Sequence, residues 1–319
     1  MWQWQKLGPI FNPADHGIDW MNHYGQCPST LVYDEFVRVF FCTRPPPDEL
    51  NRTVSRCGFV DLARGDLTKI LAVSPVPVLP LGGRGCFDEF GTYPVSVIRH
   101  GGEVRLYYGG VTRCESVKFD VAIGCAVSTD DGHSFTKMGT GPVLSSYLNE
   151  PFVISSPKIK YFNDNWHLFY ISGTTWLDQS KSPEVVYKIR HAKSNDGIDW
   201  IRTGVNIIPD KIKHNESQAS ADVYYANDKY HMFFSYRHSV DFRNQAKGYR
   251  IGYAVSTDLI HWKRSDSRVG ITVSDSGWDS EMIAYPHVFA LDGQVYMLYQ
   301  GNGFGIDGFG LARLEGELA

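Results

Sequence analysis

Apolar and polar residues alternate over short segments along much of this chain, which is the pattern of half-buried β-strands. The clearest region lies near the middle, where residues 158–162 alternate, residues 163–165 (Asn-Asp-Asn) predict a tight turn, and residues 166–171 alternate again. Residues 185–193 and 201–208 follow as two more candidate strands, with turn residues between them. Four short strands separated by turn signals predict one antiparallel, four-stranded unit.

The same unit occurs five times. Each copy opens with a short segment, usually containing proline, that leads into an alternating strand, and a strand rich in aromatic residues follows. The anchor positions are 28, 94, 157, 221 and 286, so consecutive anchors are 66, 63, 64 and 65 residues apart. Regular spacing of this kind indicates radial repetition of one supersecondary unit. The sequence therefore predicts an all-β, five-bladed β-propeller with four-stranded blades, which forms a single domain over residues 1–319.

The two ends of the chain predict how the ring closes. The fifth copy supplies three strands, within residues 288–290, 294–300 and 308–314, and lacks an outer one. The N-terminal residues 4–10 are similar to the outer segments at 135–139 and 200–204. We therefore expect the N-terminal strand to complete the last blade.

A turn of the type Ser-x-Asp, followed by an aromatic residue, occurs in three copies, at residues 128–135, 194–200 and 256–262. Ser and Asp side chains in such turns bond nearby backbone N–H groups. We expect a structural role for this turn, in which the aromatic side chain packs between neighbouring blades.

Composition excludes several classes of protein. A net charge of −4 and a pI near 6.3 argue against a nucleic-acid binder, which would carry a basic stripe. No window approaches 18 consecutive apolar residues, so no membrane span is expected, and the N-terminus lacks the charged and apolar regions of a signal peptide, which predicts a cytoplasmic protein. The six cysteines show no C-x-x-C pair and are expected to be buried thiols.

The chain carries no motif for a metal or a cofactor. The histidines show no H-E-x-x-H or comparable spacing, and neither a P-loop nor a strand-linked G-x-G-x-x-G is present. We therefore expect no metal and no cofactor, and a small-molecule or oligosaccharide substrate as the partner.

Candidate catalytic residues come from comparing positions relative to the anchors, because residues just before each inner strand of a propeller crowd around one mouth of the central funnel. Five residues before the anchors lie His23, Glu89, Phe152, Glu216 and Glu281, and in the third copy Glu150 lies two residues before Phe152. Carboxylates gathered in a partly dry site raise one another's pKa, which is typical of functional sites. We predict Glu216 and Glu281 as an acid and base pair, with Asp88 and Glu150 as further catalytic residues.

Other residues near the mouth are candidates for substrate binding. Glu89 neighbours Asp88, and the sequence leaves open which of the two faces the funnel. Arginine offers a planar donor fork for an anionic group such as phosphate or carboxylate; the alternative for any one arginine is pairing with the funnel carboxylates or exposure to solvent. Trp278 could stack on a sugar face or pack in the core. The predicted substrate-binding residues are His23, Glu89, Arg44, Arg237, His238 and Trp278.

With these features the chain resembles, over nearly its whole length, the five-bladed glycoside hydrolase superfamily that includes families 32, 43, 62, 68 and 130. The resemblance depends on the repeated Ser-x-Asp turns with their aromatic residues, on strand pairs such as residues 166–170, and on residues 277–286. It looks closest to glycosidase-like proteins of bacterial surface-polysaccharide gene clusters. It implies a glycoside hydrolase-like, carbohydrate-active enzyme that acts at a glycosidic or sugar-phosphate bond.

The chain departs from the family pattern in its first blade. Family 43 members carry an Asp on the first inner strand, an Asp in the second blade and a Glu in the third. Here the first position falls near His23 and Gln26, and Asp15 and Asp19 are the only carboxylates close by. The alternatives to a hydrolase are therefore a non-catalytic sugar-binding module or a glycosyl transferase in surface-polysaccharide biosynthesis.

Overall fold

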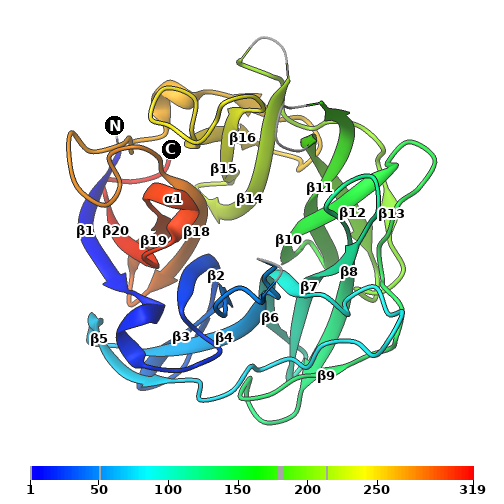
Figure 1. Ribbon diagram of the computed structural model, residues 1–319. Helices are drawn as coiled ribbons and strands as arrows, with labels where there is room; N and C mark the ends of the chain where they lie inside the picture. Colours follow the sequence, from blue (N-terminus) through cyan, green and yellow to red (C-terminus); the bar gives the residue numbers. More distant parts are fainter. Residues whose placement is uncertain (1, 50–51, 179–182, 213–214) are drawn as a thin grey trace.

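Five antiparallel sheets of four strands surround one axis in the computed structural model (Figure 1), which describes residues 2–49, 52–178, 183–212 and 215–319. The prediction of an all-β, five-bladed β-propeller is confirmed. In every sheet the strand nearest the axis pairs with the next strand in the chain, and the order continues outward. The single-domain organisation over residues 1–319 stays a prediction.

The first two blades follow one another along the chain. The first contains β2 (His23–Val32), β3 (Phe36–Arg44), β4 (Arg56–Ala63) and β5 (Asp66–Val73). The second contains β6 (Thr92–His100), β7 (Glu103–Arg113), β8 (Phe119–Ser128) and β9 (Thr136–Lys137).

The next two blades repeat this order. The third contains β10 (Phe152–Phe162), β11 (Asn165–Leu177), β12 (Glu184–Ser194) and β13 (Ile201–Arg202). The fourth contains β14 (Glu216–Ala226), β15 (Lys229–His238), β16 (Arg250–Ser256) and β17 (Lys263–Arg264). The outer strand expected over residues 201–208 is shorter than predicted, because the chain leaves the sheet after Arg202 and buries Ile207 and Ile208 in the core between blades.

The fifth blade joins both ends of the chain. It contains β18 (Ala284–Leu291), β19 (Gln294–Gln300), β20 (Phe309–Glu315) and, as its outer strand, β1 (Gln3–Phe11). Strand β1 runs antiparallel to β20, with Trp4 opposite Leu314 and Pro9 opposite Gly310. The expected closure of the ring by the N-terminal strand is confirmed.

Helical structure is minor. The described residues form two short 3₁₀ turns, Pro13–His16 and Asp266–Arg268, and one short helix, α1 (Asn302–Gly305), which lies by the fifth blade (Figure 1). No helix in the described part of the chain is long and apolar enough to cross a membrane. All six cysteines lie within the described ranges and are free thiols, and four of them are buried.

Apolar side chains are buried between blades. Five clusters each join two neighbouring blades; one, for example, packs Phe169 and Ile189 of the third blade against Val223 and Phe234 of the fourth. The aromatic residues after the Ser-x-Asp turns belong to this packing, since Trp262 of the fourth blade meets Phe169 edge-on at 6.1 Å between ring centroids. The structural role expected for these turns is confirmed.

Removal of residues 1–10 should abolish cooperative folding or lower the melting temperature by more than about 10 °C. The deletion removes the buried Trp2, Trp4 and Ile10 and leaves β20 as an unpaired edge. Large core truncations cost about 3–5 kcal/mol each, against a total stability of about 5–15 kcal/mol. Thermal unfolding followed by circular dichroism measures this. Leu7→Ala, which truncates an exposed side chain of the same strand, should melt like the parent.

Stability should fall in mild acid because of a buried histidine pair. His167 and His191 stack in parallel, with His167 Nδ1 and His191 Nε2 2.9 Å apart. Burial lowers the pKa of His167 to about 4, and burial together with the His167 charge lowers that of His191 to about 3. Because the unfolded chain then binds more protons, their contribution is complete above about pH 6.5 and is lost as the pH falls toward the folded values.

Denaturant unfolding at pH 7.5, 5.5 and 4.5 checks this expectation. A double variant, His167→Gln with His191→Gln, keeps a donor and an acceptor at each position but cannot titrate. Its stability should depend less steeply on pH than that of the parent. Equal acid dependence in both proteins would show that the pair is not responsible.

Candidate functional site

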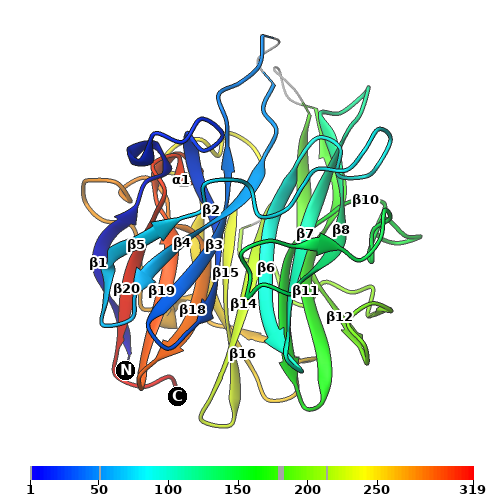
Figure 2. The same ribbon diagram turned by 90° about the horizontal axis from the view of Figure 1, so that it is seen from below.

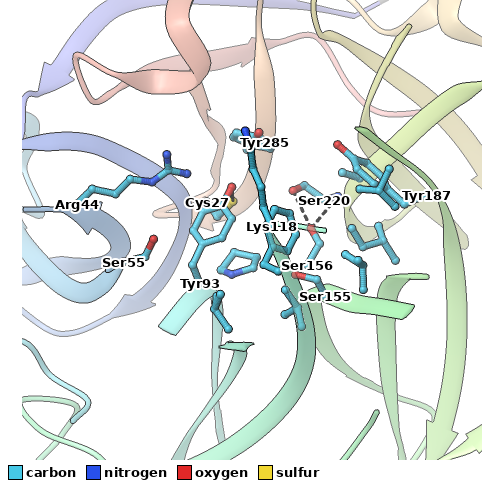
Figure 3. A pocket seen from close by; sticks show the side chains of 18 of the residues that line it. Cys27, Arg44, Ser55, Tyr93, Lys118, Ser155, Ser156, Tyr187, Ser220 and Tyr285 are labelled. Carbon is cyan, nitrogen blue, oxygen red and sulfur yellow. Dashed lines mark hydrogen bonds between the residues drawn. The ribbon is translucent and has the colours of Figure 1, made fainter. Parts of the chain in front are cut away.

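A ring of five side chains surrounds the axis where the inner strands β2, β6, β10, β14 and β18 converge. Each inner strand shows a register shift next to its anchor position. The residue before the anchor has a positive φ in four blades, between 51° and 54°. Non-glycine residues in this conformation are strained and often lie at functional sites. The five ring residues all line the central cavity (Figure 3): Cys27, Tyr93, Ser156, Ser220 and Tyr285.

The ring residues carry no charge: two are serines, and the Cys27 thiol and the two tyrosine hydroxyls keep their protons. Ser220 N donates to Ser156 Oγ at 3.1 Å, and the two hydroxyl oxygens are also 3.1 Å apart. Burial raises the pKa of the Cys27 thiol to about 11, so this thiol is not a ready nucleophile at neutral pH. Burial raises the pKa of Tyr93 and Tyr285 well above the usual range, so both hydroxyls keep their protons and can donate hydrogen bonds.

The ring forms the inner part of a funnel. An inner cavity of about 440 Å³ and an outer one of about 550 Å³ share Arg44, Tyr93, Tyr187, Tyr249 and Tyr285 among their lining residues, so they are continuous. Arg44 is the last residue of β3, and residues 45–49, which follow it, lie on the face away from both chain termini (Figure 2). The funnel therefore opens on that face.

Aromatic residues dominate the wall. Tyr249 packs against Tyr285 and Phe304, with ring centroids 5.3 and 6.0 Å away. The hydroxyls of Tyr187 and Tyr249 form a short hydrogen bond, and burial raises the pKa of both. Phe119 lines both parts of the funnel. Such a wall offers apolar ring faces together with neutral hydroxyl groups.

Two arginines lie in this aromatic wall. Arg237 is 4% exposed, lies 3.5 Å from the centroid of the Phe242 ring, and donates to the His238 carbonyl at 2.7 Å and to the Tyr187 hydroxyl at 3.0 Å. Arg44 lies 4.4 Å from the centroid of the Tyr24 ring. The predicted substrate-binding residues Arg44 and Arg237 therefore do face the funnel.

Most of the predicted catalytic carboxylates lie elsewhere. Asp88 accepts from Tyr108 at 2.9 Å and pairs with Lys137 at 2.5 Å, and Glu150 accepts from Tyr170 at 2.7 Å and pairs with Arg202 at 2.8 Å. Both carboxylates are buried, and neither lines the funnel.

Glu216 belongs to the same arrangement. It is fully buried, pairs with Arg264 at 2.6 Å, and accepts from Gln218 and from the backbone N–H groups of Lys211 and Ile212. It does not line the funnel either.

Four blades thus hold one buried carboxylate against a cation of their outer strand. In the fifth blade the pair is Asp279 and Lys6, 2.6 Å apart, with Tyr299 donating to Asp279. The donor tyrosine follows its carboxylate by 20 residues in three blades. The first blade has buried Met21 and Phe41 at this spacing and lacks the charges. We call these the blade ion pairs. In the second, third and fifth blades they bind the segment entering the blade to its second and outer strands, and in the fourth Glu216 binds the preceding loop to the outer strand.

Of the predicted acids, Glu281 lines the mouth of the funnel and is exposed. Its backbone N–H donates to Asn302 Oδ1 at 2.7 Å, which fixes the chain there. Glu89 accepts from the Gly85 N–H at 2.8 Å and does not line the funnel. The sequence left open whether Asp88 or Glu89 faces the funnel, and neither of them does. The catalytic assignments themselves stay predictions, and the geometry brings only Glu281 to the funnel.

The remaining candidates lie outside the funnel lining. His23 is the exposed first residue of β2, and His238 contributes its carbonyl to Arg237 rather than its ring to the cavity. Trp278 packs on Tyr299, 5.0 Å between ring centroids, at the edge of the core between the fourth and fifth blades. In the ranges described, no group of three or more His, Cys, Asp or Glu side chains could hold a metal ion.

Sequence reasoning missed the ring, although its signal was present. Each ring residue directly precedes its repeat anchor, and the anchors were correct. The sequence comparison used the position five residues before each anchor, where the segments entering the blades differ in length. Three of the four blade carboxylates, Asp88, Glu150 and Asp279, therefore stand six or seven residues before their anchors rather than five.

Comparison with solved structures defines the class. The chain shares its fold with a protein described as a glycoside hydrolase, with a TM-score of 0.73 at 16% identity over 99% of this chain and 92% of that one. A structure of the GH130 family, described as mannoside phosphorylases that include glycoside hydrolases targeting β-1,2 mannosidic linkages, gives 0.70 at 14% identity over 97% and 93%. The Bombyx mori GH32 β-fructofuranosidase BmSUC1 gives 0.61 at 17% identity over 99% and 61%. The chain therefore has the five-bladed β-propeller fold of these glycosidases.

Closer relatives define the family. Two proteins of Mycobacterium tuberculosis, Rv1502 of strain H37Rv and MT1551 of strain CDC 1551, are each 34% identical to this chain over 98% of its length and 99% of theirs. The chain belongs to the same family as these two mycobacterial proteins, both named as uncharacterized proteins. No family model matches the chain.

The blade ion pairs predict opposite outcomes for two predicted acids. Glu216→Gln should lower the free energy of unfolding by about 2 kcal/mol, because it removes one of the two buried carboxylates that pair with Arg264 and leaves Asp266 as the remaining counter-charge. Glu281→Gln should change it by less than about 0.5 kcal/mol, because Glu281 is exposed. Urea unfolding of both variants measures this, and equal losses would contradict the distinction.

Proposed function

We propose that the protein is a carbohydrate-active, glycosidase-like protein that binds a sugar in its axial funnel and acts there at a glycosidic or sugar-phosphate bond. The observation that supports this most is the tyrosine-rich wall around the ring residues. Sugars present apolar ring faces and many hydroxyls, and tyrosine offers an aromatic face and a donor on one side chain. The combined cavity is within the range of small-molecule sites.

The position of the acids decides which chemistry is best supported. Hydrolysis by two carboxylates requires both to flank the bond that breaks. Among the described lining residues, only Glu184 and Glu281 carry carboxylates, and Glu184 pairs with Arg243 at 2.8 Å. We therefore assign proton transfer to Glu281 and assign the buried Asp88, Glu150 and Glu216 to holding the blades together.

The ring favours a second candidate function. Its members are Cys, Ser and Tyr, so the innermost residues supply no carboxylate to attack an anomeric carbon. A sugar-binding protein or a transferase without hydrolytic activity would need none. The two candidates share the binding site and differ in whether, and from which donor, a product forms.

Binding should depend on the aromatic wall. Phe119→Ala removes a ring from both parts of the funnel and should weaken glycan binding about 5-fold to 10-fold. Tyr147→Ala, a change at an exposed aromatic residue outside the funnel, should leave binding unchanged. Titration calorimetry against sugars selected on a glycan array measures both. Absence of saturable binding to any glycan by the parent would refute the proposal.

Product analysis separates the candidate functions. If the protein turns over glycosides or glycosyl phosphates, Glu281→Gln should lower turnover by at least about 100-fold with little change in binding, as for the loss of a general acid or base. Mass spectrometry of incubations with glycans, glycosyl phosphates and activated sugar donors detects the products. Binding without any product would favour the second candidate, and full activity of Glu281→Gln would remove this residue from the mechanism.

A further inference from the structure

The funnel has more positive than negative charge, in a protein whose net charge is −4. Its described lining includes four cations, Arg44, Lys118, Arg237 and Arg243. It includes two carboxylates, Glu184 and Glu281. Arg243 and Glu184 neutralise each other at 2.8 Å. Three cations then face one carboxylate. The residues outside the described ranges include no Asp or Glu.

The three remaining cations make no ion pair with any described carboxylate, in contrast to the cations of the blade ion pairs. Arg237 makes only neutral contacts, to a carbonyl, a tyrosine hydroxyl and aromatic rings. Arg44 donates to the Gln26 side chain at 3.4 Å, and Lys118 is exposed at the cavity. The Nε atoms of Arg44 and Arg237 are buried without a hydrogen-bond partner.

Such a site is costly unless an anion completes it. A buried guanidinium without a counter-charge keeps its charge, since arginine does not lose its proton in proteins, and a buried donor without a hydrogen-bond partner destabilises the folded protein. The rings around Arg237 hold the guanidinium in place through cation–π contacts and leave its charge uncompensated. Arginine is also well suited to the planar or tetrahedral oxygens of a carboxylate or phosphate.

We infer that the sugar bound in the funnel carries an acidic group, a carboxylate or a phosphate, which lies against Arg237 and Arg44. This inference rests on the proposed function, because it names the class of sugar that the same site takes. The tyrosine hydroxyls, which keep their protons, add neutral donors to the anion. Glu281 at the mouth then faces the part of the sugar that carries no negative charge, because like charges repel.

The test compares three simple probes of similar size: glucose, glucuronic acid and glucose 1-phosphate. Calorimetric titration of the parent protein should show at least one acidic probe binding about 10-fold or more tightly than glucose. Raising the salt from 0.05 to 0.5 M should weaken acidic binding and leave glucose unaffected. The preferred acidic probe tells a carboxylate from a phosphate.

Variants locate the anion. Arg44→Gln should reduce the preference for the acidic probe over glucose at least about 5-fold, and Arg237→Lys, which keeps the charge but loses the planar fork, should also reduce it. Arg313→Gln, a change at a partly exposed arginine on β20 outside the funnel, is the matched control and should keep the full preference. Melting temperatures show that each variant is folded.

The outcomes separate this inference from the function on which it rests. If glucose binds as tightly as both acidic probes, the inference that the sugar carries an acidic group is wrong, and the proposal of sugar binding stands. An unchanged preference in both folded funnel variants would overturn the role of the arginines. Failure of all three probes and of every glycan on the array would overturn both proposals together.

Discussion

Closure of the ring is the constraint on which the structure depends. Each blade buries its two faces only against neighbouring blades, so an open ring would expose two apolar faces and an unpaired strand edge. The pairing of β1 with β20 removes that edge and links residues about 300 positions apart in the chain. Closure holds the five inner strands around one axis, and this brings the five ring residues to the same central cavity.

The blade ion pairs stabilise individual blades, whereas closure stabilises the ring as a whole. In three blades the pair fixes the segment that enters the blade to that blade's second and outer strands, and in the fourth Glu216 fixes the preceding loop to the outer strand. Removing one partner of a buried pair is far more costly than losing a surface pair. Acidic residues that resemble catalytic groups in the sequence therefore have a different purpose here, which is to place the loops around the funnel.

The funnel itself combines two kinds of chemistry. Tyrosine and phenylalanine rings supply a surface for a sugar, and unpaired arginines supply positive charge inside that surface. Three of the strained ring residues, Cys27, Ser156 and Ser220, turn small side chains toward the axis, which leaves space for a ligand where larger side chains would fill it. This arrangement is compatible with the glycosidase fold of the solved neighbours, but its inner ring lacks the carboxylates that such an enzyme uses for hydrolysis.

The sequence by itself determined the number of blades, the order of strands and the closure by the N-terminal strand, because periodicity and turn chemistry are local properties that survive in a linear pattern. It also singled out Arg44, Arg237 and Glu281. It did not distinguish Glu216 from Glu281, since both are acids five residues before an anchor. Only the tertiary structure decided that Glu216 meets Arg264 and that Glu281 meets the cavity. The reason is physical: a carboxylate's role depends on the charges and the solvent around it, and these come from residues distant in the chain.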